Sequence, residues 1–269
     1  MKTGILLAAF GSSNPKARRV LEGFEDKVRA AFPGVPIRWA FTSAIIRHRL
    51  ADEGAKVDSV QKALHKMYFE RFTHVAVQSL HVVPGAEYND LLAEVERIGR
   101  STSLPGPGKE VGRILVGAPL LAGEADAERT ALALRRHLPP GRTPGEAVLF
   151  MGHGTWHQGN SMYDLLAASL EALDSGLFIG TMADANAVRV LAARLYAEGV
   201  RKIWLAPLLA VAGAHVLWDM AGDQPDSWMS VVRAAGLECE PVLKGAAEYD
   251  GLAAIWIDHL QAVMQQLSG

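Results

Sequence analysis

Short apolar runs alternate along this chain with longer stretches in which apolar residues recur at helical spacing. Runs that are apolar on both faces are typical of parallel strands covered by helices on either side. The predicted strands are Gly4–Phe10, Ile37–Thr42, Val75–Leu80, Ile114–Ala118, Ala147–Gly152, Leu177–Thr181, Ile203–Pro207 and Glu238–Val242. The predicted helices between and after them are Pro15–Ala31, Val57–Arg71, Glu87–Gly99, Ala125–His137, Ser161–Leu173, Ala187–Gly199 and Glu248–Leu267. This alternation predicts an α/β fold.

The two halves of the chain resemble each other. With a constant offset of 128 residues, His74–Asp90 aligns with Lys202–Trp218, which places Glu87 over His215. The loop Ala9–Ser12 aligns with Gly152–Thr155 in the same order along the chain. We therefore expect a duplication: two similar doubly wound lobes, each with a parallel four-stranded sheet.

A Pro- and Gly-rich stretch, Leu138–Gly145, has the composition of a linker between the halves. We accordingly expect an N-terminal lobe over residues 1–138 and a C-terminal lobe over residues 139–247. Residues 248–269 would form a final helix, for which packing on the N-terminal lobe is one option. A second such stretch, Ser101–Lys109, is expected to be a surface loop inside the first half.

The duplication also predicts where ligands bind. In doubly wound sheets ligands lie beyond the carboxyl ends of the strands. The loops in that position are Gly11–Ser13, Gln78–Glu87, Gly152–His157, Thr181–Asp184 and Leu208–His215. If the lobes face one another, these loops line a shared central cleft.

His153 follows a predicted strand directly, between Gly152 and Gly154. Glycines on both sides allow a sharp turn and an exposed ring, which favours a functional histidine over a hydrogen-bonded structural one. His157 follows four residues later and is equally compatible with a cleft residue and a solvated one.

His215 follows an apolar run, where a helical turn is predicted to begin, so its ring can project beyond the strand end. Glu87 occupies the equivalent place in the first half. A carboxylate there can simply complement a helix N-terminus. It can also serve as a metal ligand or proton acceptor opposite His215.

Two imidazoles and a carboxylate are a typical donor set for Co²⁺, Ni²⁺, Fe²⁺ or Zn²⁺. The sequence has no Cys-x-x-Cys, His-Glu-x-x-His or EF-hand pattern, and no phosphate-binding Gly-x-x-x-x-Gly-Lys-Ser/Thr motif that would indicate ATP use. The absence of Gly-x-Ser-x-Gly also argues against an ordinary α/β-hydrolase.

Composition limits the expected partners and the expected cellular compartment. The 27 lysines and arginines against 29 aspartates and glutamates give a net charge of −2, which supplies no electrostatic case for a nucleic acid or membrane partner. The single cysteine, Cys239, fits a reducing compartment. The N-terminal apolar run fits a strand, loop and helix better than a signal peptide, so we expect a cytoplasmic protein. The sequence does not determine the oligomeric state, and a homo-oligomer is compatible with it.

The chain resembles the anaerobic, ATP-independent cobaltochelatases of the CbiK type, class II tetrapyrrole chelatases related to ferrochelatases. The resemblance runs nearly end to end. It is carried by Ala9-Phe10-Gly11-Ser12-Ser13, Ala40-Phe41-Thr42-Ser43, Val75–His81 with Glu87-Tyr88, Phe150–Gly154, Pro207–His215, Asp219-Met220-Ala221 and Asp226-Ser227-Trp228. It implies a chelatase-like fold and insertion of Co²⁺ into sirohydrochlorin, an early step of cobalamin synthesis. It further implies that His153 and His215 bind the metal, with Glu87 in the same cleft.

One position departs from the pattern of that family, which usually has a glutamate after the third strand of the second lobe. This chain has Ala183 there. Asp184 is adjacent, but a displacement of one residue would point its side chain elsewhere unless the loop is rearranged. Two histidines with Glu87 therefore form a safer set than one that needs a carboxylate at position 183.

Metal insertion removes two pyrrole N–H protons and strips water from the metal. We expect His153 to act as principal metal ligand and proton acceptor, His215 as its partner and Glu87 as a polarising or relaying carboxylate. Which histidine is the base stays open. The residues expected around the macrocycle are Phe10, Gly11, Ser12, Ser13, Leu80, Val82 and Val83, with Leu208, Leu209 and Val211 as further apolar walls. Arg47, with His48 and Arg49, could bind substrate carboxylates or form an ordinary exposed helix face.

Three alternatives remain at this level. The metal could be iron, giving sirohaem from the same substrate or haem from a porphyrin, because imidazole and carboxylate suit several metals. The protein could be a non-catalytic tetrapyrrole or metal carrier. A periplasmic binding protein has a superficially similar two-lobed architecture, although a convincing signal peptide is lacking.

Overall fold

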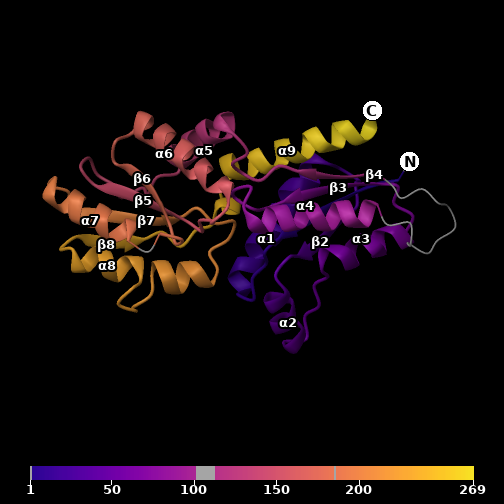
Figure 1. Ribbon diagram of the computed structural model, residues 1–269, viewed down its shortest axis with the longest axis horizontal. Coiled ribbons are helices and arrows are strands. Elements are labelled where there is room, and N and C mark those ends of the chain that lie inside the picture. The colour runs from indigo at the N-terminus through magenta and orange to yellow at the C-terminus, as the bar shows by residue number, and fades with distance from the viewer. Residues whose placement is uncertain (1, 101–112, 185) are drawn as a thin grey trace. The chain divides into compact units, whose positions relative to one another are not determined.

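The computed structural model describes residues 2–100, 113–184 and 186–269. The chain folds into two compact units (Figure 1): residues 1–120 with 253–269, and residues 121–252. The predicted surface loop Ser101–Lys109 lies outside the described residues. Among the described helices, none combines the length and apolar character needed to span a membrane.

The first unit contains one parallel sheet with strand order β2-β1-β3-β4. Its central strand β1 pairs with β2 through Ile5 and Ile37, and with β3 through Ile5 and Ala76. The elements are β1 (Thr3–Ala9), α1 (Pro15–Ala31), β2 (Ile37–Phe41), α2 (Ala44–Asp52), α3 (Val60–Phe69), β3 (His74–Ser79), α4 (Ala86–Gly99) and β4 (Arg113–Gly117), with most of α9 (Asp250–Ser268).

The second unit repeats this arrangement with strand order β6-β5-β7-β8, all parallel. Its elements are α5 (Glu124–Arg136), β5 (Ala147–Gly152), a 3₁₀ turn (Gln158–Asn160), α6 (Ser161–Leu173), β6 (Leu177–Thr181), α7 (Ala187–Ala197), β7 (Lys202–Pro207), a π-helical turn (Val216–Met220), α8 (Trp228–Ala234), β8 (Glu238–Pro241) and a second 3₁₀ turn (Ala246–Glu248). The predicted α/β class and the duplicated parallel four-stranded sheets are confirmed.

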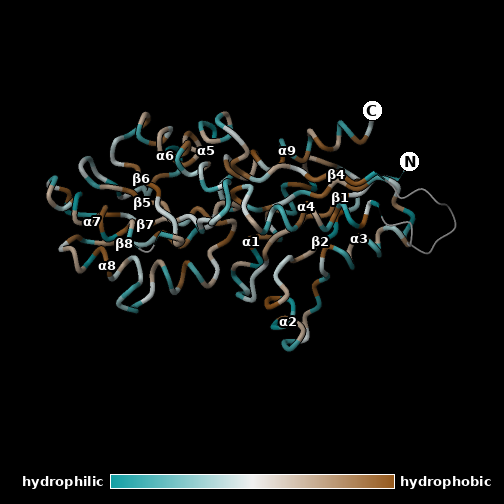
Figure 2. The backbone as a smooth tube through the Cα atoms, in the orientation of Figure 1, coloured by the Kyte–Doolittle hydropathy of each residue, from teal (hydrophilic) through white to brown (hydrophobic). Residues whose placement is uncertain are grey.

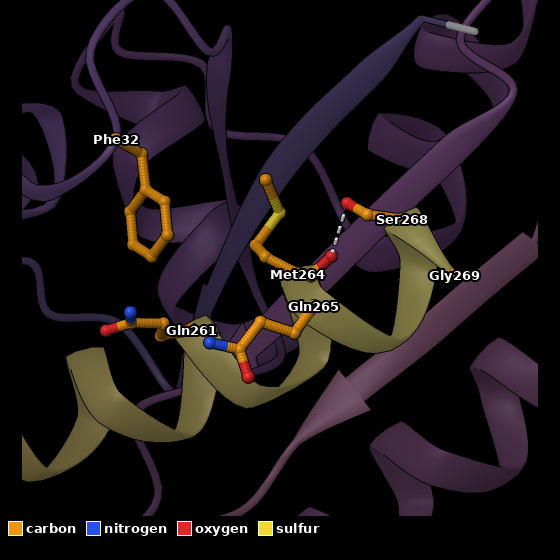
Figure 3. A pocket seen from close by; sticks show the side chains of 6 residues that line it. All are labelled: Phe32, Gln261, Met264, Gln265, Ser268 and Gly269. Atoms are coloured by element: carbon orange, nitrogen blue, oxygen red, sulfur yellow. Dashed lines mark hydrogen bonds between the residues drawn. The ribbon is translucent and has the colours of Figure 1, made fainter.

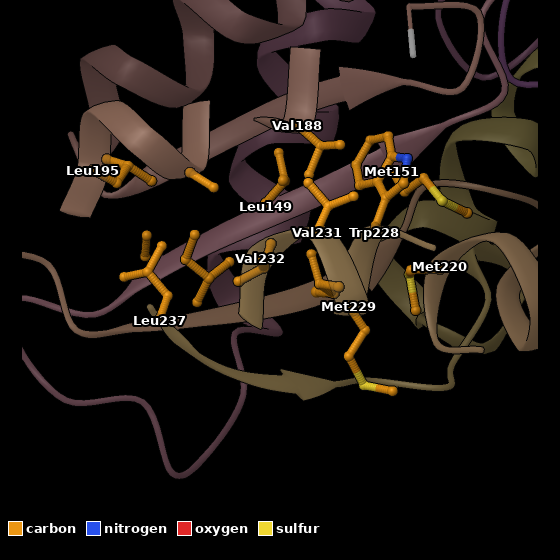
Figure 4. Close-up of a cluster of buried hydrophobic side chains, with 14 of the residues drawn as sticks. Leu149, Met151, Val188, Leu195, Met220, Trp228, Met229, Val231, Val232 and Leu237 are labelled. Carbon is orange, nitrogen blue, oxygen red and sulfur yellow. The ribbon is translucent and has the colours of Figure 1, made fainter. Parts of the chain in front are cut away.

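Buried strands and helix faces hold each sheet in place. In Figure 2 the strands of both sheets contain many brown, apolar residues. Figure 4 shows the core of the second unit, where Leu149 and Met151 of β5 lie among Trp228 and Val232 of α8. Fully burying a side chain of this size stabilises the fold by roughly 1.5–3 kcal/mol.

Side-chain caps start several helices. Asn14 accepts a hydrogen bond from the backbone N–H of Lys16 at the start of α1. Ser43 and Ser227 similarly cap α2 and α8, two helices that the apolar pattern alone did not single out. Such caps satisfy backbone donors that have no partner inside the helix.

The units divide at Leu120 and Leu121, rather than at the predicted boundary between residues 138 and 139. The reason is that α5 packs against α6 and so belongs to the second unit. The Pro- and Gly-rich stretch 138–145 is accordingly the connection between α5 and β5 inside that unit.

The second unit also extends to Leu252, past the predicted end at residue 247. From Ala253 onward the chain belongs to the first unit. There the indole N–H of Trp256 donates to the backbone carbonyl of His81, with 3.2 Å between the nitrogen and oxygen.

Candidate metal centre

Two histidine rings lie together in the second unit. The ring centroids of His153 and His215 are 5.3 Å apart and their planes meet at 78°. Both residues are exposed to solvent. The sequence predicted that each residue follows a strand, and the structure shows that these two strands, β5 and β7, are paired in the sheet.

Different physical reasons explain why the two residues beside His153 are glycines. A Cβ at Gly152 would lie 2.5 Å from the Tyr163 ring. Gly154 has a φ of +78°, and a Cβ there would lie 2.6 Å from the Cβ of Ala183. Gly152 therefore leaves room for the Tyr163 ring, Gly154 allows the turn after His153, and His153 itself is exposed.

His215 is held by the segment before it and the turn after it. The backbone N–H groups of Ala246 and Ala247 donate to the carbonyls of Leu209 and Ala210, which fixes the loop after β7. The π-helical turn that follows His215 buries Val216 completely in the core.

Both rings form a hydrogen bond through the same nitrogen, Nδ1. His153 Nδ1 lies 3.1 Å from the carbonyl oxygen of Gly154, and His215 Nδ1 lies 2.6 Å from Oδ2 of Asp219. A carbonyl and a carboxylate oxygen only accept, so Nδ1 carries the proton in each hydrogen bond. In a neutral imidazole with its proton on Nδ1, Nε2 carries the lone pair that binds a metal or accepts a proton.

The rings of His153 and His215 are a pair of donors that the described residues of the second unit bring together. No cluster of three histidine, cysteine, aspartate or glutamate side chains suitable for a metal occurs in the described parts of the chain. Burial raises the pKa of Cys239 to about 12, so its thiol does not provide a thiolate near neutral pH. Two protein donors would leave other coordination positions of a bound ion open to further ligands.

Asp184, the doubtful substitute for the missing glutamate, has a structural contact. Its Oδ1 accepts hydrogen bonds from the backbone N–H groups of Asn186 and Ala187 at the start of α7. Ala183 itself packs beside Gly154, next to His153 in sequence.

Glu87 lies in the first turn of α4 in the first unit and is half-buried. Its carboxylate acts on the nearby His81. Burial lowers the pKa of His81 to about 4, although the charge of Glu87 acts in the opposite direction. His81 Nδ1 bonds the Ser79 hydroxyl at 2.7 Å, while its Nε2 is buried without a hydrogen-bond partner in the described structure.

The residues expected to contact a macrocycle differ in exposure. Phe10 is 48% exposed, whereas Leu80, Val82 and Val83 are buried in the first unit. Gly11 has a φ of +94°, and the Ser12 hydroxyl accepts from the backbone N–H of Asn14. Of the remaining positions in this set, Ser13 is half-buried and Leu208 fully buried, while Leu209 and Val211 are partly exposed.

Arg47, His48 and Arg49 lie on α2. The Nη1 of Arg47 donates to the backbone carbonyls of Phe41 and Thr42, so this group secures the end of β2. His48 and Arg49 are exposed.

The pocket drawn in Figure 3 belongs to the first unit and has a volume of about 450 Å³. Its lining offers amide and hydroxyl groups but no histidine or carboxylate side chain, so it does not supply a metal site. The lining residues are Phe32, Gln261, Met264, Gln265, Ser268 and Gly269.

Solved structures share this fold. SirB from Bacillus subtilis with Fe³⁺ superposes with a TM-score of 0.66 over 98% of this chain and 96% of its own, at 13% identity. CbiX, described as the terminal enzyme for siroheme biosynthesis in denitrifying bacteria, gives 0.59 over 96% of this chain and 98% of its own, at 15% identity. The two sheets therefore have a chelatase fold.

The sequence identifies the family more narrowly. This chain belongs to the cobalt chelatase (CbiK) family, whose model matches residues 3–265. It is 53% identical over 99% of its length to the sirohydrochlorin cobaltochelatase CbiKC of Nitratidesulfovibrio vulgaris, covering 92% of that protein. It is 32% identical to the sirohydrochlorin cobaltochelatase of Salmonella typhimurium, over 98% of this chain and 97% of that one. The predicted family resemblance is confirmed.

Asp219 is the functional candidate that the motif analysis did not assign. Its signal is the spacing His-x-x-x-Asp, because residues four apart on a helix share a face.

Proposed function

We propose that this chain inserts Co²⁺ into sirohydrochlorin without ATP, with the imidazole pair holding the ion and accepting pyrrole protons. The pairing of His153 and His215, each with Nδ1 bonded and Nε2 free, carries this proposal. Family membership and the activity named for the relative at 53% identity support the substrates.

The reaction needs few groups from the protein. Two pyrrole N–H bonds break, two protons leave, and four nitrogen–metal bonds replace the water and imidazole ligands of the ion. An imidazole near neutrality binds a metal loosely enough to release it and can then accept a proton. No redox or phosphoryl step enters this balance, so neither an electron donor nor ATP is required.

We assign supporting roles to first-unit residues on sequence grounds. Glu87 would polarise or relay a pyrrole proton, and Phe10 would contact the macrocycle through its exposed ring. Arg47, His48 and Arg49 remain candidates for the substrate carboxylates. Asp184 would assist only through the oxygen that does not cap α7.

We place the reaction in the cytoplasm because a single, unpaired cysteine fits a reducing compartment.

The assay combines protein, sirohydrochlorin and Co²⁺ under anaerobic conditions and follows the absorbance of the macrocycle. We expect a rate well above the protein-free rate for wild type and a large loss for His153→Ala. A wild-type rate equal to the background would refute the enzyme, and an unimpaired His153→Ala would refute the site. Parallel reactions with Fe²⁺ and Ni²⁺ decide the metal, since imidazole donors suit all three. Stable binding of metallated macrocycle without turnover would instead indicate a carrier.

A further inference from the structure

The two imidazoles of the pair differ in what holds them. His153 donates its Nδ1 proton to the neutral carbonyl of its own neighbour, Gly154. His215 donates to the Asp219 carboxylate, with 2.6 Å between Nδ1 and Oδ2. A hydrogen bond to an ionised acceptor is roughly twice as strong as one to a neutral acceptor.

We propose that Asp219 is a positioning residue that fixes the ring orientation and tautomer of His215, and that it makes His215 the stronger metal donor of the pair in place of His153, the principal ligand expected from the sequence. This inference rests on the proposed function for the identity of the metal site. A carboxylate that accepts the Nδ1 proton keeps that proton on Nδ1 and so leaves the lone pair on Nε2. It also increases the electron density that Nε2 offers to a cation.

The local backbone explains how Asp219 reaches the ring. Residues 216–220 form a π-helical turn, closed by the Ala221 N–H donating to the Val216 carbonyl. Val216 and Met220 are fully buried and anchor the turn in the core. His215 and Asp219, four positions apart, therefore lie on its exposed side, at 49% and 54% side-chain exposure. Turns of this type interrupt regular helices and are frequent at functional sites.

Asp219 has no competing cationic partner that would explain its presence. In residues 2–100, 113–184 and 186–269, its recorded ion-pair contact is the one with His215. A surface pair of this kind contributes little to stability, about 0–1 kcal/mol. The contact with Asp219 therefore affects the orientation of the His215 ring more than the stability of the fold.

The test compares Asp219→Asn, Asp219→Ala and Asp219→Glu with wild type. The asparagine retains an accepting oxygen but not the charge, whereas alanine removes both. Asp223→Asn is the matched control, because Asp223 is exposed four residues further along and changes the net charge equally. Co²⁺ affinity is measured by titration without macrocycle, and the tautomer of His215 by nitrogen NMR of its labelled ring.

We expect Asp219→Ala to weaken Co²⁺ binding by about 10- to 100-fold, which is typical when a carboxylate behind a ligand histidine is lost. Asp219→Asn should fall between alanine and wild type, Asp219→Glu should restore part of the affinity, and Asp223→Asn should match wild type. The NMR signal of His215 should change from one tautomer to a mixture in Asp219→Ala.

Wild-type Co²⁺ affinity in Asp219→Ala, together with an unchanged His215 tautomer, would overturn the role of Asp219. Failure of the proposed metal site has a different signature: His153→Ala and His215→Ala would both bind Co²⁺ as wild type does. In that case the tautomer measurement still decides whether Asp219 orients His215.

Discussion

The two units share a backbone plan but carry different side chains at equivalent positions. Both have four parallel strands in the same order, and both turn after the first strand through a glycine at positive φ, Gly11 or Gly154. The residue before that glycine is Phe10 in the first unit and His153 in the second. Glu87 stands where the second unit has His215.

This comparison separates what the fold requires from what the chemistry requires. The strand order and the tight turn recur whether the residue before the turn glycine is Phe10 or His153, so they serve the architecture. In the second unit the rings of His153 and His215 lie close together, whereas the equivalent positions of the first unit carry Phe10 and Glu87. The proposed metal site would accordingly depend on a few side chains at strand ends, as expected for sites added to a common fold.

The largest expected effect tests the equivalent positions Phe10 and His153. His153→Ala should lower kcat by about 1000-fold, within the range for loss of a positioned acid–base group. Phe10→Ala should mainly raise KM for the macrocycle, because only apolar contact is lost. Steady-state kinetics with sirohydrochlorin and Co²⁺ measures both. His157→Ala, on the same loop as His153, serves as control and should retain activity. A Phe10→Ala variant with the larger loss of kcat would reverse the assignment of chemistry between the units.

Lowering the pH should destabilise the first unit more than the second. The first unit has the buried His81, and the equivalent position of the second unit is Leu209, which does not titrate. The pKa of His81 is lowered to about 4 by burial, so the unfolded chain binds the extra proton first as pH falls from 6.5 to 4. The first unit should therefore lose up to ~3 kcal/mol of stability over this window and keep it above pH 6.5. Hydrogen exchange resolved by unit measures the change, and His81→Gln should flatten it. Equal acid sensitivity in both units would contradict the prediction.

The shared glycines should be equally intolerant of a side chain. Gly154→Ala and Gly11→Ala should each cost about 2 kcal/mol, because positive φ is strained for alanine and the new Cβ meets Ala183 or the Phe41 ring. Gly199→Ala, at a φ of +93° with no atom within 4 Å, should cost only about 1 kcal/mol. Urea denaturation of the three variants gives the comparison. If Gly11→Ala proved harmless, the turns would not be equivalent.

The smallest effect concerns the carboxylate missing from the second unit. Ala183→Glu should strengthen Co²⁺ binding by about tenfold, because the side chain starts beside Gly154 and adds an oxygen donor near His153. Ala183→Gln is the matched control and should give less gain, since an amide is a weaker donor. Titration with Co²⁺ in the absence of macrocycle measures both. No gain with glutamate would mean that the loop directs position 183 away from the imidazoles.

Much of the fold followed from the sequence pattern. The bounds of α1, β5, α6 and β6 agree with the prediction, because apolar periodicity and strong end signals coincide there. The division of the units did not follow. Residues 138–145 have linker composition, but α5 before them packs on α6, and only tertiary packing reveals that.

The candidate site was predictable in part. Strand-end glycines and the internal repeat singled out His153 and His215, and the structure brings their rings together. The contact between His215 and Asp219 depends on a π-helical turn, which apolar periodicity does not distinguish from an ordinary helical turn. The burial of Val82 and Val83 could not be predicted from the sequence either, because apolar residues after a strand are compatible both with a ligand-binding wall and with the core.

The return of the final helix to the first unit has a consequence for biosynthesis. Residues 121–252 form one contiguous stretch, whereas the first unit needs residues from both ends of the chain. Because translation proceeds from the N-terminus, the unit with the histidine pair can fold on the ribosome while the earlier-made unit still lacks Trp256 and the rest of α9. The half synthesised first is thus the half completed last, and premature termination after residue 252 would spare the imidazoles but leave their neighbouring unit unfinished.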